Sequence, residues 1–133
     1  MNNEIESKNS KNKFELEGNV GNIGTIYTNT NSKKMLRFDL CQNNNGNSQF
    51  IPIVLRGSIV ETYGNNIQKG DWISVKGRIS TYQKDVEIDG KIYKDKAIDI
   101  LGFEITDKKN NKVYTSDGQI YELTDNKNKE MDR

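Results

Sequence analysis

Histidine is absent from the 133 residues, and cysteine occurs once, at Cys41. Without histidine, the chain cannot form a Ser-His-Asp triad or a histidine-ligated metal site. A single cysteine cannot form a disulfide within the chain. Because no base partner for Cys41 is visible, we interpret it as a small strand residue and not as a nucleophile. We therefore expect no enzymatic activity, no metal and no cofactor.

Long apolar runs are also missing. No stretch is long enough for a membrane span or a signal peptide, which predicts a cytoplasmic protein with no membrane partner. Hydrophobic residues make up 32% of the chain and charged residues 29%. This composition is typical of one compact β domain with a modest core, which gains stability when it assembles into oligomers.

An excess of one charge is missing too. The formal net charge is +1, and the segment 14–105 contains 11 basic and 11 acidic residues. Contacts with phosphates usually dominate the affinity of nucleic-acid-binding proteins. Binding to nucleic acid would therefore depend on where the positive side chains lie and not on their number.

The most informative stretch that is present is a strand–helix–strand pattern over 50–82. In its first strand, Ile51, Ile53 and Leu55 alternate with residues that include Phe50 and Arg56. Successive side chains of a strand point to opposite faces. The aliphatic side chains therefore share one face, and Phe50 and Arg56 share the other.

The second strand of this pattern spans 72–82. Its apolar face is formed by Ile73, Val75 and Ile79. Its other face carries positive side chains, with Trp72 and Tyr82 at its two ends. Two half-buried strands that present aromatic and basic groups outward predict a platform for a flat, anionic ligand.

A short helix is expected between these two strands. Ser58 and Glu61 match the S-x-x-E pattern of a capping box, which marks the start of a helix. Val60, Tyr63 and Ile67 form a short apolar stripe. We expect two or three helical turns that plug one end of a sheet.

Two more strands and a loop precede this unit. Alternation predicts a first strand over 14–20, and Gly18, Gly21 and Gly24 allow a strong bend or bulge. A second strand covers 35–40. The segment 42–48 is rich in asparagine and glycine, which predicts a mobile loop.

The rest of the chain contains two Asp-Gly turns, each a strong hairpin signal. The first predicts a β-ribbon over 86–93, and the second predicts a hairpin over 113–121. Between them, 97–105 is the last barrel strand, with a bulge at Gly102.

This order of elements predicts an all-β protein with a five-stranded OB-fold Greek-key barrel. One short helix lies between the third and fourth strands, and an extra hairpin follows the barrel. The predicted division of the chain is a disordered N-terminal arm over 1–13, an OB-fold domain over 14–105, a β-hairpin extension over 106–123 and a flexible tail over 124–133.

Four segments resemble the bacterial single-stranded-DNA-binding protein family. They are FELEGNVGNIG from residue 14, FIPIVLRG from residue 50, KGDWISVKGRISTY from residue 69 and AIDILGF from residue 97. The resemblance covers 14–105. It implies an OB-fold homo-oligomer, a tetramer or a dimer, that wraps single-stranded DNA in replication, repair or recombination.

The resemblance also implies roles for single residues. Phe50 stands where the family commonly has a base-stacking tryptophan, and Arg56 stands where it often has a stacking phenylalanine. Tyr82 lies near the family's aromatic residue at the root of the ribbon.

Two features depart from the family pattern. The chain ends in DNKNKEMDR and lacks the apolar tip of the family's acidic tail. Recruitment of repair enzymes through such a tip is therefore not expected. The additional hairpin over 113–121 is consistent with a divergent branch carried by a plasmid, a phage or a conjugative element.

The candidate site residues are aromatic and basic. We expect Phe50, Trp72, Tyr82 and Tyr93 to stack on bases; the alternative is that they cover sheet edges or lie in a subunit interface, and Trp72 would then pack on the helix or a neighbouring subunit. The candidate phosphate contacts, which would otherwise be only solvated charges, are Lys33, Lys34, Arg37, Arg56, Lys76, Arg78, Lys84, Lys91 and Lys94.

The acidic residues of the ribbon do not form a calcium site. Asp85, Glu87 and Asp89 resemble the start of an EF-hand loop, but Lys96 stands where that loop needs a bidentate glutamate. The alternation here is that of a hairpin, without the flanking helices of an EF-hand.

Two functions of different classes remain open. The first is binding of single-stranded DNA with little sequence preference, in replication, repair, recombination or conjugation. The second is a protein-interaction adaptor, similar to primosome-type relatives of the family or related to conjugation, with weak or no nucleic-acid binding. The balanced charge favours the second.

Overall fold

The fold is a small, mainly antiparallel β-barrel, described for residues 9–123 by a computed structural model. Five strands form its wall: β1 (Phe14–Ile23), β3 (Lys34–Asn44), β4 (Asn47–Arg56), β5 (Trp72–Ile88) and β6 (Lys91–Asp107). They are hydrogen-bonded in the order β4-β3-β1-β5-β6. A parallel pairing of Val54 with Leu101 joins β4 to β6 and closes the barrel. The predicted five-stranded OB fold is therefore confirmed.

The core follows the alternation of the strands. Leu36, Phe38 and Leu40 of β3 and Ile53 and Leu55 of β4 are at most 2% exposed. They face each other across the β3–β4 pairing, so one apolar face of each strand fills the barrel.

Barrel closure also buries a residue that the alternation places outside. Val54 lies on the outer face of β4 but is only 1% exposed. It packs with Met35 and Leu101 in a second small cluster. The strands β3, β4 and β6 therefore share an apolar patch beneath the outer surface.

The expected bend in β1 is present. The pairing of β1 with β3 shifts between Val20 and Ile23, where the strand turns from one side of the barrel to the other. A side chain at Gly18 would collide with the carbonyl oxygen of Cys41, so only glycine fits there.

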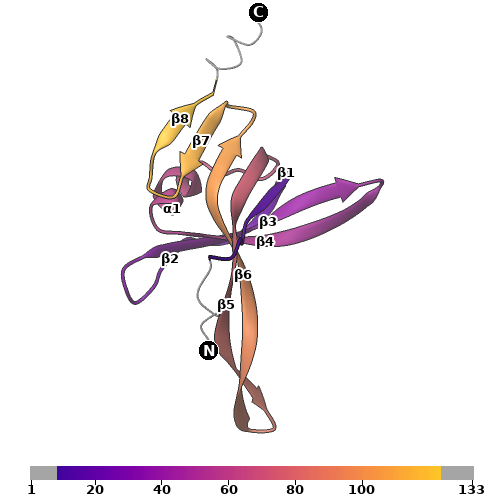
Figure 1. Ribbon diagram of the computed structural model, residues 1–133, viewed down its shortest axis with the longest axis vertical. Coiled ribbons are helices and arrows are strands. Elements are labelled where there is room, and N and C mark those ends of the chain that lie inside the picture. The colour runs from indigo at the N-terminus through magenta and orange to yellow at the C-terminus, as the bar shows by residue number, and fades with distance from the viewer. Residues whose placement is uncertain (1–8, 124–133) are drawn as a thin grey trace, which may run out of the picture.

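The strands β5 and β6 form one long hairpin that extends beyond the barrel as a ribbon (Figure 1). The register shifts by one residue, because Lys76 pairs with Glu104 but Gly77 pairs with Gly102. The expected bulge next to Gly102 is thus confirmed, and Phe103 is its unpaired residue.

Ile79 was expected in the core but is 43% exposed. It pairs with Ile100, one step beyond the pair that includes Leu101, where β6 meets β4. At this point the two strands leave the barrel and continue as a ribbon. A position on the inward face of a strand is therefore buried only where the strand is part of the barrel.

The helical segment comprises α1 (Ser58–Thr62) and the 3₁₀ turn η2 (Tyr63–Asn65). The predicted capping box is wrong: Gly57 occupies the N-cap position, with a φ of 79°, and no side chain among residues 9–123 caps the helix. The expected plug is confirmed, because Val60 and Tyr63 are fully buried in the core. Ile59 is buried with them.

The mobile loop predicted for 42–48 is a regular hairpin. The pairing of β3 with β4 continues to Asn44 and Asn47, and the two-residue turn has Asn45 at a φ of 53° and Gly46 at 85°. Asn-Gly is the preferred sequence for such a type I′ turn, a signal that the polar composition obscured. The hairpin projects from the barrel as an arm (Figure 1).

The predicted C-terminal hairpin consists of β7 (Lys112–Thr115) and β8 (Ile120–Glu122). β7 pairs with β6, so the hairpin extends the barrel sheet. The Tyr114 ring packs on the Tyr63 ring with centroids 5.0 Å apart. The boundary between barrel and extension stays a prediction, and the tail over 124–133 and positions 1–8 of the arm lie outside the described residues.

The short strand β2 (Tyr27–Thr28) pairs with the start of β3. Within residues 9–123, no helix is long and apolar enough to cross a membrane.

Candidate nucleic-acid interface

The outer face of the barrel presents an aromatic residue at each end of one lateral row. Trp72 pairs with Asn19, Asn19 with Cys41, and Cys41 with Phe50. Directly paired residues point to the same side of a sheet. Trp72 and Phe50 therefore share the outer face, three strand spacings or about 14 Å apart along the sheet.

Phe50 is the most exposed aromatic side chain of this row. Its exposed fraction is 62%, against 43% for Trp72. The Phe50 ring lies beside Gly21, which has no side chain to cover it. A ring so exposed on a regular strand is available as a stacking surface, as its alternation predicted.

Trp72 lines a polar hollow of about 420 Å³ together with residues of β1 and β3, which include Asn19, Cys41 and Gln42. Its ring therefore borders an open surface on the same side of the barrel as Phe50.

Arg37 and Arg56 share a carboxylate that the sequence analysis did not identify. Arg56 donates a hydrogen bond from Nη2 to Oδ2 of Asp99 over 2.9 Å, and Nη1 of Arg37 lies 3.6 Å from Oδ1. Asp99 is 3% exposed, whereas both arginine side chains are 48% exposed. The buried carboxylate thus holds two guanidinium groups at the surface. Its signal in the sequence is a single acidic residue within the apolar strand AIDILGF.

Arg56 also lies near two lysines, Lys33 at the end of the β2–β3 loop and Lys34 at the start of β3. Lys33, Lys34 and Arg56 line one hollow of about 420 Å³. The Oδ1 atom of Asn29 accepts hydrogen bonds from the backbone N–H groups of Asn31 and Lys33, which orders the loop. Three predicted phosphate contacts therefore converge at the end of β4.

The ribbon has two different faces. Tyr82 pairs with Ala97, and Ser80 pairs with Asp99 next to it, so Tyr82 continues the outer face of the barrel. By the same alternation, this face carries Tyr82, Lys84, Lys91 and Tyr93. Tyr82 and Tyr93 are 41% and 47% exposed.

Lys94 lies on the opposite face of the ribbon. It pairs with Asp85, and its Nζ atom lies 2.7 Å from the Oδ1 atom of that residue. Lys94, predicted as a phosphate contact, therefore lies on the face of the ribbon opposite to Tyr82, Lys84, Lys91 and Tyr93.

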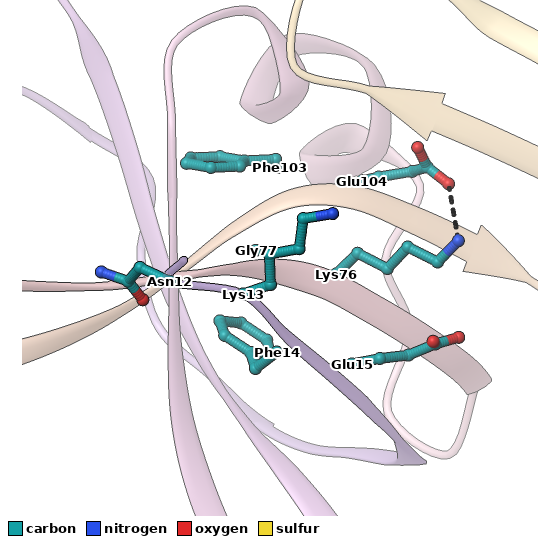
Figure 2. A pocket seen from close by; sticks show the side chains of 8 residues that line it. All are labelled: Asn12, Lys13, Phe14, Glu15, Lys76, Gly77, Phe103 and Glu104. Carbon is teal, nitrogen blue, oxygen red and sulfur yellow. Dashed lines mark ion pairs between the residues drawn. The ribbon is translucent and has the colours of Figure 1, made fainter. Parts of the chain in front are cut away.

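Lys76 and Arg78 occupy a different part of the wall, near the bulge in β6. The Nζ atom of Lys76 lies 3.9 Å from Oε2 of Glu104. The guanidinium carbon of Arg78 lies 5.6 Å from the centre of the Phe103 ring. Phe103 is a further exposed aromatic residue that the sequence analysis missed, because its exposure depends on the bulge. Figure 2 shows this region from close by.

The barrel end beneath the hairpin contains two buried tyrosines. Burial is the main cause that raises the pKa of Tyr63, and its hydroxyl donates to Asp71 over 3.3 Å. Burial likewise raises the pKa of Tyr114, with Asp107 as the next cause. These groups stabilise the fold and lie apart from the exposed aromatic face. Residues 9–123 contain no cluster of three or more acidic, cysteine or histidine side chains suited to a metal ion.

Comparison with known proteins agrees with this geometry. The model of the single-strand binding protein family matches residues 11–99. A solved structure of a mitochondrial single-stranded DNA binding protein from S. cerevisiae superposes with a TM-score of 0.54 at 18% identity, covering 70% of this chain and 90% of that chain. No curated protein matches the sequence. Since the family model covers most of the barrel, the chain belongs to the single-strand binding protein family.

Proposed function

We propose that this protein binds single-stranded DNA with little sequence preference. The observation that carries the proposal is Phe50, 62% exposed on the outer face that also holds Arg37 and Arg56. An exposed ring stacks on any base, and guanidinium groups further along the same face neutralise any phosphate, so neither contact reads sequence. The family match supports the same conclusion.

The proposed path of the strand follows the outer face. Bases stack on Phe50, the backbone passes the arginines held by Asp99, and the chain continues to Tyr82 and Tyr93 on the ribbon. Lys33 and Lys34 at the end of β4 and Lys84 and Lys91 on the ribbon supply further phosphate contacts. Trp72, at the β5 end of the row that begins at Phe50, extends the stacking surface across β3 and β1.

The test is a titration of fluorescent oligo-dT at two salt concentrations with the wild type and Phe50→Ala. We expect affinity to fall steeply with salt. We expect the Phe50 substitution to weaken binding roughly 5- to 100-fold, which is the range for loss of one stacked base. Tyr121→Ala, at an exposed ring on β8, is the matched control. Binding that responds neither to salt nor to Phe50→Ala contradicts the proposal.

The proposal includes assembly into a dimer or tetramer and a role in replication, repair, recombination or DNA transfer. Support for assembly comes from the ribbon, where Ile79, Ile92 and Ile98 are 43%, 66% and 63% exposed. The molar mass in solution tests this part. A cytoplasmic location stays a prediction.

The alternative is an adaptor that assembles proteins on the barrel and binds nucleic acid weakly. The net charge of +1 favours it, since most non-specific binders carry an excess of positive charge. Wild-type protein that does not bind oligo-dT at low salt, but captures a defined replication or transfer protein in purified form, would favour the adaptor.

A further inference from the structure

The short strand β2 carries an exposed aromatic ring, Tyr27, that the proposed path of the DNA strand does not use. Its exposed fraction is 48%, against 41% for Tyr82 and 47% for Tyr93. Tyr27 pairs with Met35 on β3, and Met35 pairs with Arg56 on β4. Directly paired residues point to the same side of a sheet. Tyr27 therefore lies on the same outer face as Arg56, two strand spacings or about 10 Å away along the sheet.

The Tyr27 ring leans toward the middle of this face. Its hydroxyl donates to Sδ of Met35 over 2.9 Å, so the tip of the ring points toward β3 and not away from the sheet. Met35 is 9% exposed and packs with Val54 and Leu101, which gives the ring an apolar support. The ring is thus anchored at its hydroxyl end while nearly half of the residue stays open to solvent. A ring held in place in this way loses little freedom when a base stacks on it.

The connection from β2 to β3 is a compact turn. The backbone N–H of Asn29 donates to the carbonyl oxygen of Lys33 over 2.9 Å, and the N–H of Ser32 donates to the carbonyl oxygen of Asn29 over 3.0 Å. The Asn29 side chain adds the two bonds to the backbone of Asn31 and Lys33. This network fixes the position of Lys33 relative to Tyr27.

The hollow between this turn and the end of β4 contains positive charge alone. Its charged lining residues are Lys33, Lys34 and Arg56, and none of the lining residues is acidic. Arg56 is paired with Asp99, whereas neither lysine forms an ion pair within residues 9–123. A phosphate group in this hollow would therefore meet three positive side chains and no lining carboxylate.

Tyr27 and Phe50 lie at opposite ends of the same pair of strands. The outer face of β3 runs from Met35 through Arg37 to Cys41, which pairs with Phe50. Arg56 and Phe50 are six residues apart on β4, or about 20 Å. Figure 1 shows the turn after β2 and the arm formed by β3 and β4 on opposite sides of the barrel. The two arginines held by Asp99 therefore lie between two exposed rings.

From this geometry we infer that Tyr27 is a further base-stacking residue, at the end of the outer face opposite to Phe50. A base stacks on the Tyr27 ring, and Lys33 and Arg56 contact the phosphates beside it. A later segment of a longer strand follows the ribbon. This inference rests on the proposed function, and it adds the turn between β2 and β3 to the surface that binds DNA.

The test uses the full chain and fluorescent oligo-dT of about 16 nucleotides, the upper end of the site sizes of OB folds. Tyr27→Ala is expected to weaken binding roughly 5- to 100-fold, as for the loss of one stacked base. Tyr27→Phe keeps the ring and removes only the hydroxyl, so it should bind like the wild type. Tyr27→Leu covers Met35 without an aromatic face, so it should bind as weakly as Tyr27→Ala. Tyr121→Ala is again the control.

The salt dependence of binding separates stacking from an indirect effect through the lysines. Tyr27→Ala should leave the slope of log affinity against log salt concentration unchanged, because it removes no phosphate contact. Lys33→Gln should instead reduce this slope by about 0.7, the value for one phosphate contact with a single strand.

Three results would overturn the inference. The first is unchanged binding by Tyr27→Ala while Phe50→Ala still weakens it. The second is full binding by Tyr27→Leu, which would show that the residue serves only to cover Met35. The third is a slope that falls as much in Tyr27→Ala as in Lys33→Gln, which would show that the ring acts by holding the lysines in place. Failure of the wild type to bind the oligonucleotide would instead overturn the proposed function itself.

Discussion

Asp99 shows how one buried residue determines the behaviour of two exposed ones. Its Oδ2 atom accepts a hydrogen bond from Arg56, whereas its Oδ1 accepts none from residues 9–123 and lies 3.6 Å from Arg37. A buried carboxylate without a donor is costly. Arg56 therefore has a structural role in addition to any contact with phosphate. The structural role of Arg37 is smaller, because it makes no hydrogen bond to Asp99.

We expect Arg56→Ala to lower the free energy of unfolding by about 1–3 kcal/mol, because the buried carboxylate loses its charged donor. Arg37→Ala should cost less, since its guanidinium lies beyond hydrogen-bond distance. Urea unfolding of both variants measures the difference. Equal losses in the two variants would show that Asp99 is not held chiefly by Arg56.

The two buried tyrosines predict a loss of stability at alkaline pH. Their pKa values are raised in the folded state, so the folded protein favours the protonated hydroxyls. This contribution is complete below the pKa of an unfolded tyrosine, about 10, and is lost as the pH rises above it. Urea midpoints should therefore fall above about pH 10. Tyr63→Phe should decline less steeply over the same range, and an identical decline would contradict the assignment.

Among the elements, the ribbon formed by β5 and β6 has two faces with different side chains, because the alternation of the strands continues outside the barrel. Its strands pair without interruption from Gly77 and Gly102 to Ile88 and Lys91. Each face therefore keeps its own set of side chains over the whole length. One face continues the outer surface of the barrel, and the other carries the pair of Asp85 and Lys94.

This difference gives a matched pair of substitutions. Lys84→Gln should reduce the slope of log affinity against log salt concentration by about 0.7, the value for one phosphate contact with a single strand. Lys94→Gln should leave the slope unchanged, because this lysine lies on the other face and is paired with Asp85. Oligo-dT titrations over a range of salt concentrations measure both slopes. If Lys94→Gln has the larger effect, the strand follows the opposite face of the ribbon.

At the scale of the whole molecule, the C-terminal hairpin shares the core of the barrel. Tyr114 is 4% exposed and belongs to the same hydrophobic cluster as Tyr63 and Ile105. A side chain at Gly118 would come within 3.2 Å of Ser58, so the hairpin also lies against the start of the helix. The hairpin thus covers the end of the barrel that α1 plugs.

We expect Tyr114→Ala to destabilise the whole chain by about 3–5 kcal/mol, as for other large aromatic residues removed from a core. Tyr121→Ala, on the same hairpin with a ring that is 55% exposed, should stay within about 0.5 kcal/mol of the wild type. Thermal or urea unfolding measures both. A neutral Tyr114→Ala would show that the hairpin is a separate unit that the barrel does not need.

Much of the barrel could be predicted because strand alternation and Asp-Gly turns are local signals. The five strands, the helix between β4 and β5, and both hairpins follow from residues that are close together in the chain. The outward position of Phe50, Tyr82 and Tyr93 follows in the same way, since parity along one strand decides it. Local composition misled at 42–48, where polar residues suggested a loop and the Asn-Gly turn makes a hairpin.

What only the tertiary structure decided depends on contacts between distant segments. The pairing of β4 with β6 buries Val54, the bulge in β6 exposes Phe103, and the end of the barrel exposes Ile79. The ion pairs of Asp99 join β6 to residues 43 and 62 positions away. The sequence by itself thus determined which side chains each strand could offer, because alternation is set by the backbone of that strand. Barrel closure and register determined which of them reach the surface together, because these depend on where the strands meet.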